Sequence, residues 1–306
     1  MSSLAGVALL IGGVVLVVAG AEVFFKGLLD TAARLGVAPF VLAVVVSGFE
    51  LENLAAGIAA NVKGLPNAAA GTFLGGTTFL ALGVTGLAAL LAPIGAHLPL
   101  AAIAWTAASP LPLLALGIDG EISRIDGGVL LVWFVVAVIG LARSGRSLES
   151  AEELEKRRRF SALRLVAGLA ILSAGGELLG EGIRRVVSRF GIAESLLGNT
   201  VIAASVEAEE VGRVAGSARH GRGDVAIGNV VGTIVHFAAF NAGVIALVRP
   251  IQLDGPSQAL HLPVAVAATL LLALLLLVRR ELGRWDGLAL LLLYAGYVAA
   301  AIAVAL

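Results

Sequence analysis

The chain carries one pattern of acidic residues twice, in two copies that are 157 residues apart. The acidic core of each copy lies in strongly apolar sequence, where ionisable side chains are costly and mark functional sites by default. The matching elements are Glu50-Leu51-Glu52-Asn53 and Glu207-Ala208-Glu209-Glu210, then Lys63-Gly64 and His220-Gly221, then Gly71 with Gly75 and Gly228 with Gly232. A later glycine, Gly86 or Gly243, keeps the same spacing. The chain is therefore predicted to contain two structurally similar halves.

The composition indicates a polytopic helical membrane protein. Charged residues make up 14% of the chain and the mean hydropathy is +1.00, and several apolar runs reach the ~20 residues that a helix needs to cross a bilayer. We expect ten transmembrane helices, near residues 4–23, 37–61, 67–92, 98–117, 127–143, 163–180, 192–217, 224–248, 259–278 and 286–305.

A single long polar stretch, 144–162, divides these helices into two groups of five. It separates a first repeat, 1–143 with its acidic motif at 48–64, from a second repeat, 163–306 with its motif at 205–221. An odd number of spans in each half gives the halves opposite orientations in the membrane. The predicted fold is thus an all-α membrane protein built from two inverted five-helix repeats, an arrangement typical of transporters that bind their substrate between the repeats.

The distribution of basic residues predicts the orientation. If both termini lie outside, 15 of the 21 Lys and Arg residues fall on the inner side, with Arg213 counted among them. Because basic residues are enriched in cytoplasmic loops, we expect both termini outside, the 144–162 loop in the cytoplasm as a solvated linker, and residence in the plasma membrane.

Other function classes find little support. The net charge of zero gives no reason to expect nucleic acid, and the absence of cysteine removes disulfides and thiolate chemistry. No enzyme motif is present, and the four histidines lack metal-ligand spacing. The expected partners are inorganic cations and the lipid bilayer, with no cofactor beyond the transported ions, and the sequence does not indicate an oligomeric state.

The duplicated acids form the predicted ion site. Glu50 and Asn53 are three residues apart, as are Glu207 and Glu210, so each pair shares a helix face. Where the two faces meet, three carboxylates and an amide would offer the oxygen ligands that hard cations prefer. Glu52 and Glu209 would join them only if each helix is broken there. The alternative is that these acids sit at helix ends in water.

Two further residues are candidate ligands in the second repeat. Thr233 offers a hydroxyl oxygen, although a bond to its own helix would be an ordinary alternative. His236 lies one turn beyond Gly232 and is either a packed histidine or an ion ligand. The GxxxG pairs are expected to mediate close helix packing.

At these residues the chain resembles the cation/calcium antiporter superfamily, which includes the sodium/calcium exchangers. The resemblance rests on His220-Gly221-Arg222-Gly223-Asp224, on Gly228-Asn229-Val230-Val231-Gly232-Thr233, and on Arg124-Ile125-Asp126-Gly127 with Arg284-Trp285-Asp286-Gly287. It implies two inverted five-helix repeats with extracellular termini. It places the family's ion-binding glutamate on Asn53 in one repeat and on Glu210 in the other.

The resemblance also implies altered ion chemistry. The family's ligand serine before its motif proline becomes Glu50 or Glu207, and the proline becomes Glu52 or Glu209. Hydroxyl and amide groups of the flanking Na⁺ sites are largely replaced. We expect a secondary antiporter that exchanges a divalent cation, with Ca²⁺ as the first candidate, for Na⁺ or H⁺. The alternatives are a transporter of Mg²⁺, Mn²⁺ or K⁺ with H⁺ coupling, a non-transporting membrane scaffold, and more remotely an intramembrane enzyme.

Overall fold

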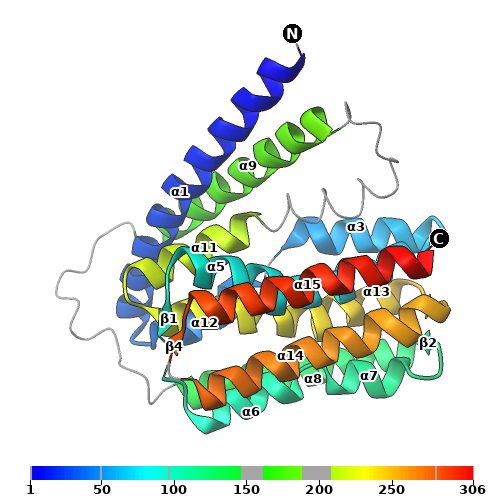
Figure 1. Cartoon of the computed structure of the whole chain (residues 1–306). Helices are drawn as coiled ribbons and strands as arrows, with labels where there is room; N and C mark the ends of the chain where they lie inside the picture. Colours follow the sequence, from blue (N-terminus) through cyan, green and yellow to red (C-terminus); the bar gives the residue numbers. More distant parts are fainter. Residues whose placement is uncertain are drawn as a thin grey trace.

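The computed structural model describes residues 2–48, 50–95, 97–145, 161–187, 208–279 and 281–305. Nearly all of them are helical (Figure 1). The elements of the first half are α1 (Ser2–Leu35), α2 (Pro39–Ser47), α3 (Leu51–Val62), α4 (Pro66–Thr78), η1 (Phe79–Val84), α5 (Thr85–Leu91), β1 (Ile94–Gly95), α6 (Leu100–Ala108), α7 (Leu111–Gly117), β2 (Glu121–Ile122) and α8 (Arg124–Gly145). Those of the second half are α9 (Ser161–Val187), α11 (Ala208–Arg219), α12 (Gly223–Val235), η4 (His236–Asn241), α13 (Ala242–Val248), β3 (Ile251–Gln252), η5 (Ser257–His261), α14 (Leu262–Val278), β4 (Glu281–Leu282) and α15 (Arg284–Ala305).

The predicted duplication is visible in the secondary structure. The run α3, α4, η1, α5 and β1 recurs as α11, α12, η4, α13 and β3 at the 157-residue spacing. Both copies turn at a glycine with positive φ, Gly64 at 80° and Gly221 at 71°, a conformation that glycine adopts without steric cost. Both copies also contain a π-helical segment, η1 or η4, within the membrane-length helix, a distortion that is frequent at functional sites.

The two halves pack against each other through reciprocal contacts. Strand β1 pairs with β4 and β2 with β3, so that each antiparallel pair joins one half to the other. Helix α5 packs on α15, and its counterpart α13 packs on α8. A Cβ on Gly86 would lie 2.9 Å from the Gly287 carbonyl oxygen, and one on Gly243 would lie 2.9 Å from that of Gly127. Equivalent glycines thus make equivalent close crossings, as a pseudo-two-fold axis requires.

The structure supports the predicted spans in part. Within the described ranges seven helices have the length and composition to cross a membrane: Ala8–Leu35, Pro66–Leu91, Leu100–Gly117, Arg124–Gly145, Gly223–Val248, Ser257–Val278 and Arg284–Val304. The predicted span 163–180 lies within α9. The predicted span 37–61 is divided between α2 and α3, and the first part of 192–217 lies outside the described residues. The linker prediction for 144–162 also falls largely outside them.

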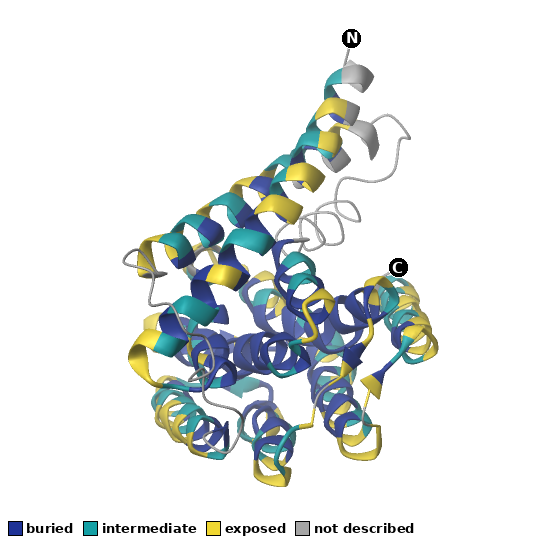
Figure 2. Ribbon diagram, turned by 90° about the vertical axis from the view of Figure 1, so that its left-hand side faces the viewer, coloured by how far each residue is buried: buried dark blue, intermediate teal, exposed yellow. Residues whose placement is uncertain are grey.

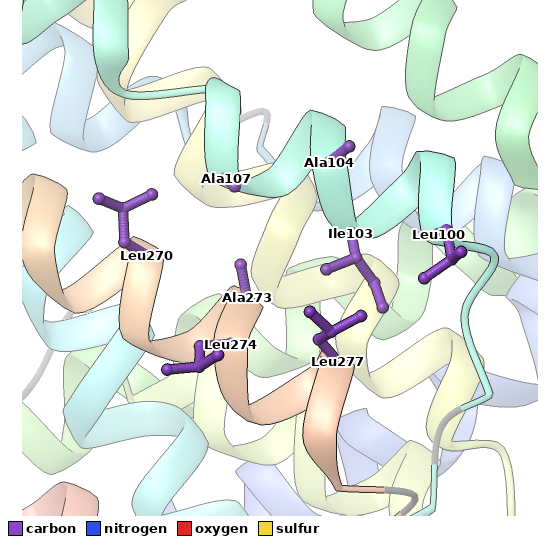
Figure 3. Close-up of a pocket in the computed structure, with 8 residues that line it drawn as sticks. All are labelled: Leu100, Ile103, Ala104, Ala107, Leu270, Ala273, Leu274 and Leu277. Carbon is purple, nitrogen blue, oxygen red and sulfur yellow. The ribbon is translucent and has the colours of Figure 1, made fainter.

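Buried residues gather in the middle of the bundle, and exposed residues lie on the outward faces of the outer helices (Figure 2). Several outward residues are large and apolar, such as Val132 on α8 and Leu292 on α15, which are 67% and 64% exposed. Helices α6 and α14 also form a groove between them that is lined only by alanine, leucine and isoleucine side chains (Figure 3). Such surfaces suit lipid tails, and none of these groove residues can bind an ion.

Helices α1 and α9 form a long pair that leans away from the rest of the bundle (Figure 1). Their contact is lined by glycines spaced seven residues apart, Gly20 and Gly27 on α1 and Gly168, Gly175 and Gly182 on α9. A Cβ at Gly27 would lie 2.4 Å from the Leu165 backbone nitrogen. Without a hydrophobic driving force between helices in lipid, such small residues let the backbones approach and gain van der Waals contact.

We predict that Gly20→Val lowers the thermal unfolding midpoint of the detergent-solubilised protein. A Cβ there would lie 2.8 Å from the Leu172 backbone nitrogen, and overpacking of this kind costs ~1–3 kcal/mol. Gly12→Val is the matched control, because it carries the same β-branched penalty in the same helix but has no described atom within 4 Å of its Cβ. Equal midpoints for the two variants would contradict the close α1–α9 contact.

Candidate ion-binding site

The predicted second span is broken where the first acidic motif begins. Helix α2 ends at Ser47 and α3 starts at Leu51, so that Glu50 occupies the N-cap position in the gap. Its side chain is buried, and it accepts a hydrogen bond from Asn53 Nδ2. The expected Glu50–Asn53 pair therefore forms. The partial positive charge of a helix N-terminus favours an anionic group at this position.

The second motif supplies two further buried carboxylates. Glu209 and Glu210 lie in the first turn of α11, and they are 8% and 0% exposed. Glu209 Oε2 accepts a hydrogen bond of 2.8 Å from Ser173 Oγ on α9. Glu209 therefore lies beside the other acids within the first described turn of α11.

Arg213, one turn further along α11, lies at the centre of the carboxylates. Its Nη2 atom is 2.6 Å from Glu210 Oε1, 3.1 Å from Glu209 Oε1 and 3.1 Å from Glu50 Oε1. Its Nη1 atom donates to the Ser47 backbone oxygen, and the guanidinium carbon lies 6.0 Å from the centre of the Phe24 ring. Glutamates of both repeats are therefore joined through one buried guanidinium, which is 2% exposed.

This position of Arg213 corrects the sequence analysis, which counted it among the basic residues on the cytoplasmic side. The count is wrong for Arg213 because its charge is compensated by carboxylates of the same apolar core, so the residue has no need of water or a lipid headgroup. The sequence signal that could have placed Arg213 in the site is its spacing from the two glutamates. Glu209 and Glu210 precede it by four and three residues, the separations at which side chains on one helix meet.

Thr233 on α12 completes the described shell around Glu210. Its Oγ1 atom lies 2.8 Å from Glu210 Oε1 and 3.2 Å from the Ser47 backbone oxygen, and it also contacts the Asn229 carbonyl oxygen of its own helix. The residue is fully buried and stands near the middle of the 26-residue span Gly223–Val248. The site is therefore deep within the apolar part of the protein.

Glu210 Oε2 and both side-chain polar atoms of Asn229 are buried nearby and have no hydrogen-bond partner among the described residues.

The GxxxG of the second repeat brings α2 against this site. A Cβ on Gly232 would lie 2.4 Å from Ser47 Oγ and 2.5 Å from the Val44 carbonyl oxygen, and one on Gly228 would lie 3.0 Å from the Phe40 carbonyl oxygen. The expected close packing thus forms at this copy. At the first copy, a Cβ on Gly71 or Gly75 would have no described atom within 4 Å.

The remaining predicted ligands are His236, Glu207 and Glu52, of which the structure describes only the side chain of His236. His236 Nδ1 lies 2.8 Å from the Gly232 carbonyl oxygen, and its ring packs edge-on against Phe134. A Cβ on Gly48 would collide with that ring, so His236 fills the space beside the α2–α3 break. Glu207 and the side chain of Glu52 lie outside the described residues.

The described acidic side chains of the site are arranged around Arg213. Within the described ranges, no group of three or more His, Asp or Glu residues has the geometry to hold a metal. Three carboxyl groups share the single guanidinium, however, so the centre retains more acidic than basic groups. Because Arg is always protonated in proteins, the centre can attract a further cation only if the carboxylates turn some of their oxygens toward it.

Comparison with known proteins identifies the family. A family described as sodium/calcium exchanger protein matches residues 5–142 and 160–303, which include both repeats. The chain belongs to the sodium/calcium exchanger family. The resemblance seen in the sequence is thereby confirmed, and so is its interpretation as a multi-pass membrane protein of the exchanger type.

Individual relatives match either most of the chain or about half of it. The inner membrane protein YrbG of Escherichia coli (strain K12) is 28% identical over 88% of this chain and 87% of its own length. The sodium/calcium exchanger MaX1 of Methanosarcina acetivorans is 26% identical over 48% of this chain and 42% of its own length. A solved structure of the sodium-calcium exchanger NCX_Mj, soaked with zero Na⁺ and Ca²⁺, has a TM-score of 0.83 and 26% identity, and the match covers 96% of this chain and 98% of that one.

We predict that Thr233→Val weakens the site more than the matched change Thr269→Val. Both threonines are fully buried and lie within hydrogen-bonding distance of the carbonyl oxygen four residues earlier, but Thr233 Oγ1 lies closer to Glu210 Oε1, to which it can donate its one hydrogen instead. Loss of that hydrogen bond to a charged group costs ~1.5–3 kcal/mol. We therefore expect a lower unfolding midpoint and weaker Ca²⁺ binding for Thr233→Val, measured by thermal unfolding and calorimetric titration. Indistinguishable variants would remove Thr233 from the site.

Proposed function

We propose that the protein is a secondary antiporter that exchanges a divalent cation, with Ca²⁺ as the first candidate, for Na⁺ or H⁺. The observation that carries this proposal is the convergence of duplicated acids: Glu50 of the first repeat and Glu210 of the second contact the same guanidinium atom deep in the apolar core. Oxygen ligands drawn from both inverted repeats can be exposed to either side of the membrane as the repeats rock against each other.

In this proposal Glu50, Asn53, Glu207 and Glu210 are the central ligands. Glu52 and Glu209 are additional carboxylates, and Thr233 and His236 support the site from α12 and η4. Carboxylate and amide oxygens suit Ca²⁺, Mg²⁺ or Mn²⁺ better than soft metals. Both termini would lie outside the plasma membrane. The altered hydroxyl and amide positions noted in the sequence are the reason to treat H⁺ as an equal alternative to Na⁺.

A second candidate function is favoured by one observation. Arg213 already fills the space between the carboxylates, which suits a membrane scaffold that keeps the fold and has lost transport. Such a protein would show no saturable cation binding. The two candidates are separated by one experiment on purified protein in liposomes.

We predict that the reconstituted protein takes up radioactive Ca²⁺ when an outward Na⁺ or an outward H⁺ gradient is imposed. The gradient that drives uptake identifies the coupling ion. A competition panel of Mg²⁺, Mn²⁺ and K⁺ then identifies the preferred substrate. Absence of uptake under both gradients, together with absence of binding for all four cations, would support the scaffold and overturn the antiporter.

We predict that Glu50→Gln and Glu207→Gln each lower this uptake by roughly tenfold or more, since loss of one charged ligand weakens a hard-cation site by at least ~1.4 kcal/mol. Glu181→Gln is the control, because Glu181 is paired with Arg185 in a half-exposed ion pair on α9. It should transport as the unaltered protein does. Unchanged uptake in the first two variants would show that the ligands are assigned wrongly.

A further inference from the structure

Arg213 is an unusual residue for a cation site, because it brings a permanent positive charge to the place where a cation should bind. It is 2% exposed, and its Nη2 atom alone contacts three carboxylates from two segments of the chain. An arginine side chain that only stabilised the bundle could pair with one carboxylate, as Arg164 of α9 does with Asp30 of α1. The geometry around Arg213 is that of a cation surrounded by oxygen ligands.

The internal repeat shows how this charge is distributed between the halves. At the 157-residue spacing, Glu210 corresponds to Asn53 and Arg213 corresponds to Ala56. At these two positions the second repeat has an acid and an arginine where the first has neither. These two side chains form the shortest ion pair of the centre, at 2.6 Å. The arginine balances the acid that the first repeat lacks.

We propose, building on the exchange function above, that Arg213 is a tethered cation that takes the place of one monovalent coupling ion. In the structure its guanidinium contacts Glu50, Glu209 and Glu210, and in the proposed cycle it holds them whenever no divalent cation is bound. A divalent cation binds by drawing Glu50 and Glu210 away from it. The site is then never without positive charge, and one fewer soluble cation is needed to refill it in each cycle.

Electrostatics gives the direction of the expected changes. A guanidinium within 3.1 Å of the ligand oxygens competes with the incoming cation and repels it. Removing Arg213 leaves its carboxylates uncompensated in a medium of low dielectric, where opposite charges are attracted strongly. Without Arg213 the site should therefore bind Ca²⁺ more tightly and should need one more monovalent cation to replace it.

The test compares four proteins in detergent and in liposomes: the unaltered chain, Arg213→Gln, Glu209→Gln and the double variant. Calorimetric titration with Ca²⁺ measures affinity. The membrane potential at which Ca²⁺ flux reverses, at fixed gradients, gives the number of coupling ions per Ca²⁺. Arg164→Gln is the matched control, since it removes a partly buried interhelical ion pair away from the site.

We expect roughly tenfold or greater tightening of Ca²⁺ binding in Arg213→Gln, with one additional coupling ion per Ca²⁺. Glu209→Gln should weaken binding by a similar factor, and the double variant should return close to the unaltered protein in both measurements because its site has the same net charge. Arg164→Gln should change neither. These results would support a tethered cation and would not follow from a purely structural role.

Other results overturn the proposal in distinguishable ways. Unchanged affinity and reversal potential in Arg213→Gln would make Arg213 a structural residue, and lost Ca²⁺ binding would show that it organises the carboxylates without competing. If Arg213→Gln does not fold, the comparison moves to Glu209→Gln and the double variant, where equal affinities would refute competition. Failure of the unaltered protein to bind and transport Ca²⁺ overturns the proposed exchange itself, and the tethered cation with it.

Discussion

Charge compensation without water is the constraint on which this structure depends. Three glutamates are buried in an apolar bundle, where an uncompensated carboxylate would be costly. Arg213 provides the compensation, and the surrounding elements hold it in place. The break between α2 and α3 turns Glu50 and the Ser47 carbonyl oxygen toward it, and Phe24 of α1 covers it from the side. Loss of any of these elements would leave a buried charge less well compensated.

The proposed exchange requires such a centre to change its exposure, and the two halves are joined by equivalent contacts. Equivalent glycine crossings, at Gly86 with Gly287 and at Gly127 with Gly243, join helices that belong to different repeats. The strand pairs β1–β4 and β2–β3 join the same halves. Because the contacts of the first half on the second are equivalent to those of the second on the first, a movement that opens the centre to one side has an equivalent movement that opens it to the other side. Alternating access through inverted repeats depends on that equivalence.

Much of this fold could be predicted from the sequence because its signals are local. The duplicated elements and the turn glycines Gly64 and Gly221 appear where the pattern places them, and seven of the expected apolar runs form helices of membrane-spanning length within the described residues. The seven-residue glycine spacing of α1 and α9 is present in the sequence too, but it becomes meaningful only when the two helices are seen side by side. The η1 and η4 segments have no comparable sequence signal, since a π-helical turn depends on tertiary packing.

The site was predicted less completely, for a physical reason. Glu50 contacts Asn53, which shares its helix face in the sequence, and Glu50 and Glu210 meet at one guanidinium. Glu209 and Thr233 also lie there, although spacing alone does not place them. From the sequence, Arg213 is assigned to the cytoplasmic side because basic residues usually mark loops. That rule describes charges that need water, and it fails where several carboxylates supply the compensation instead. The fold and the charge of the centre are set by different residues in this family member. Equivalent glycine crossings are kept in the two repeats, while Glu210 and Arg213 stand where the first repeat has an amide and an alanine, so the charges at the centre are unequal. A symmetric fold with an asymmetric centre can alter the number of ions that it binds without altering how it moves.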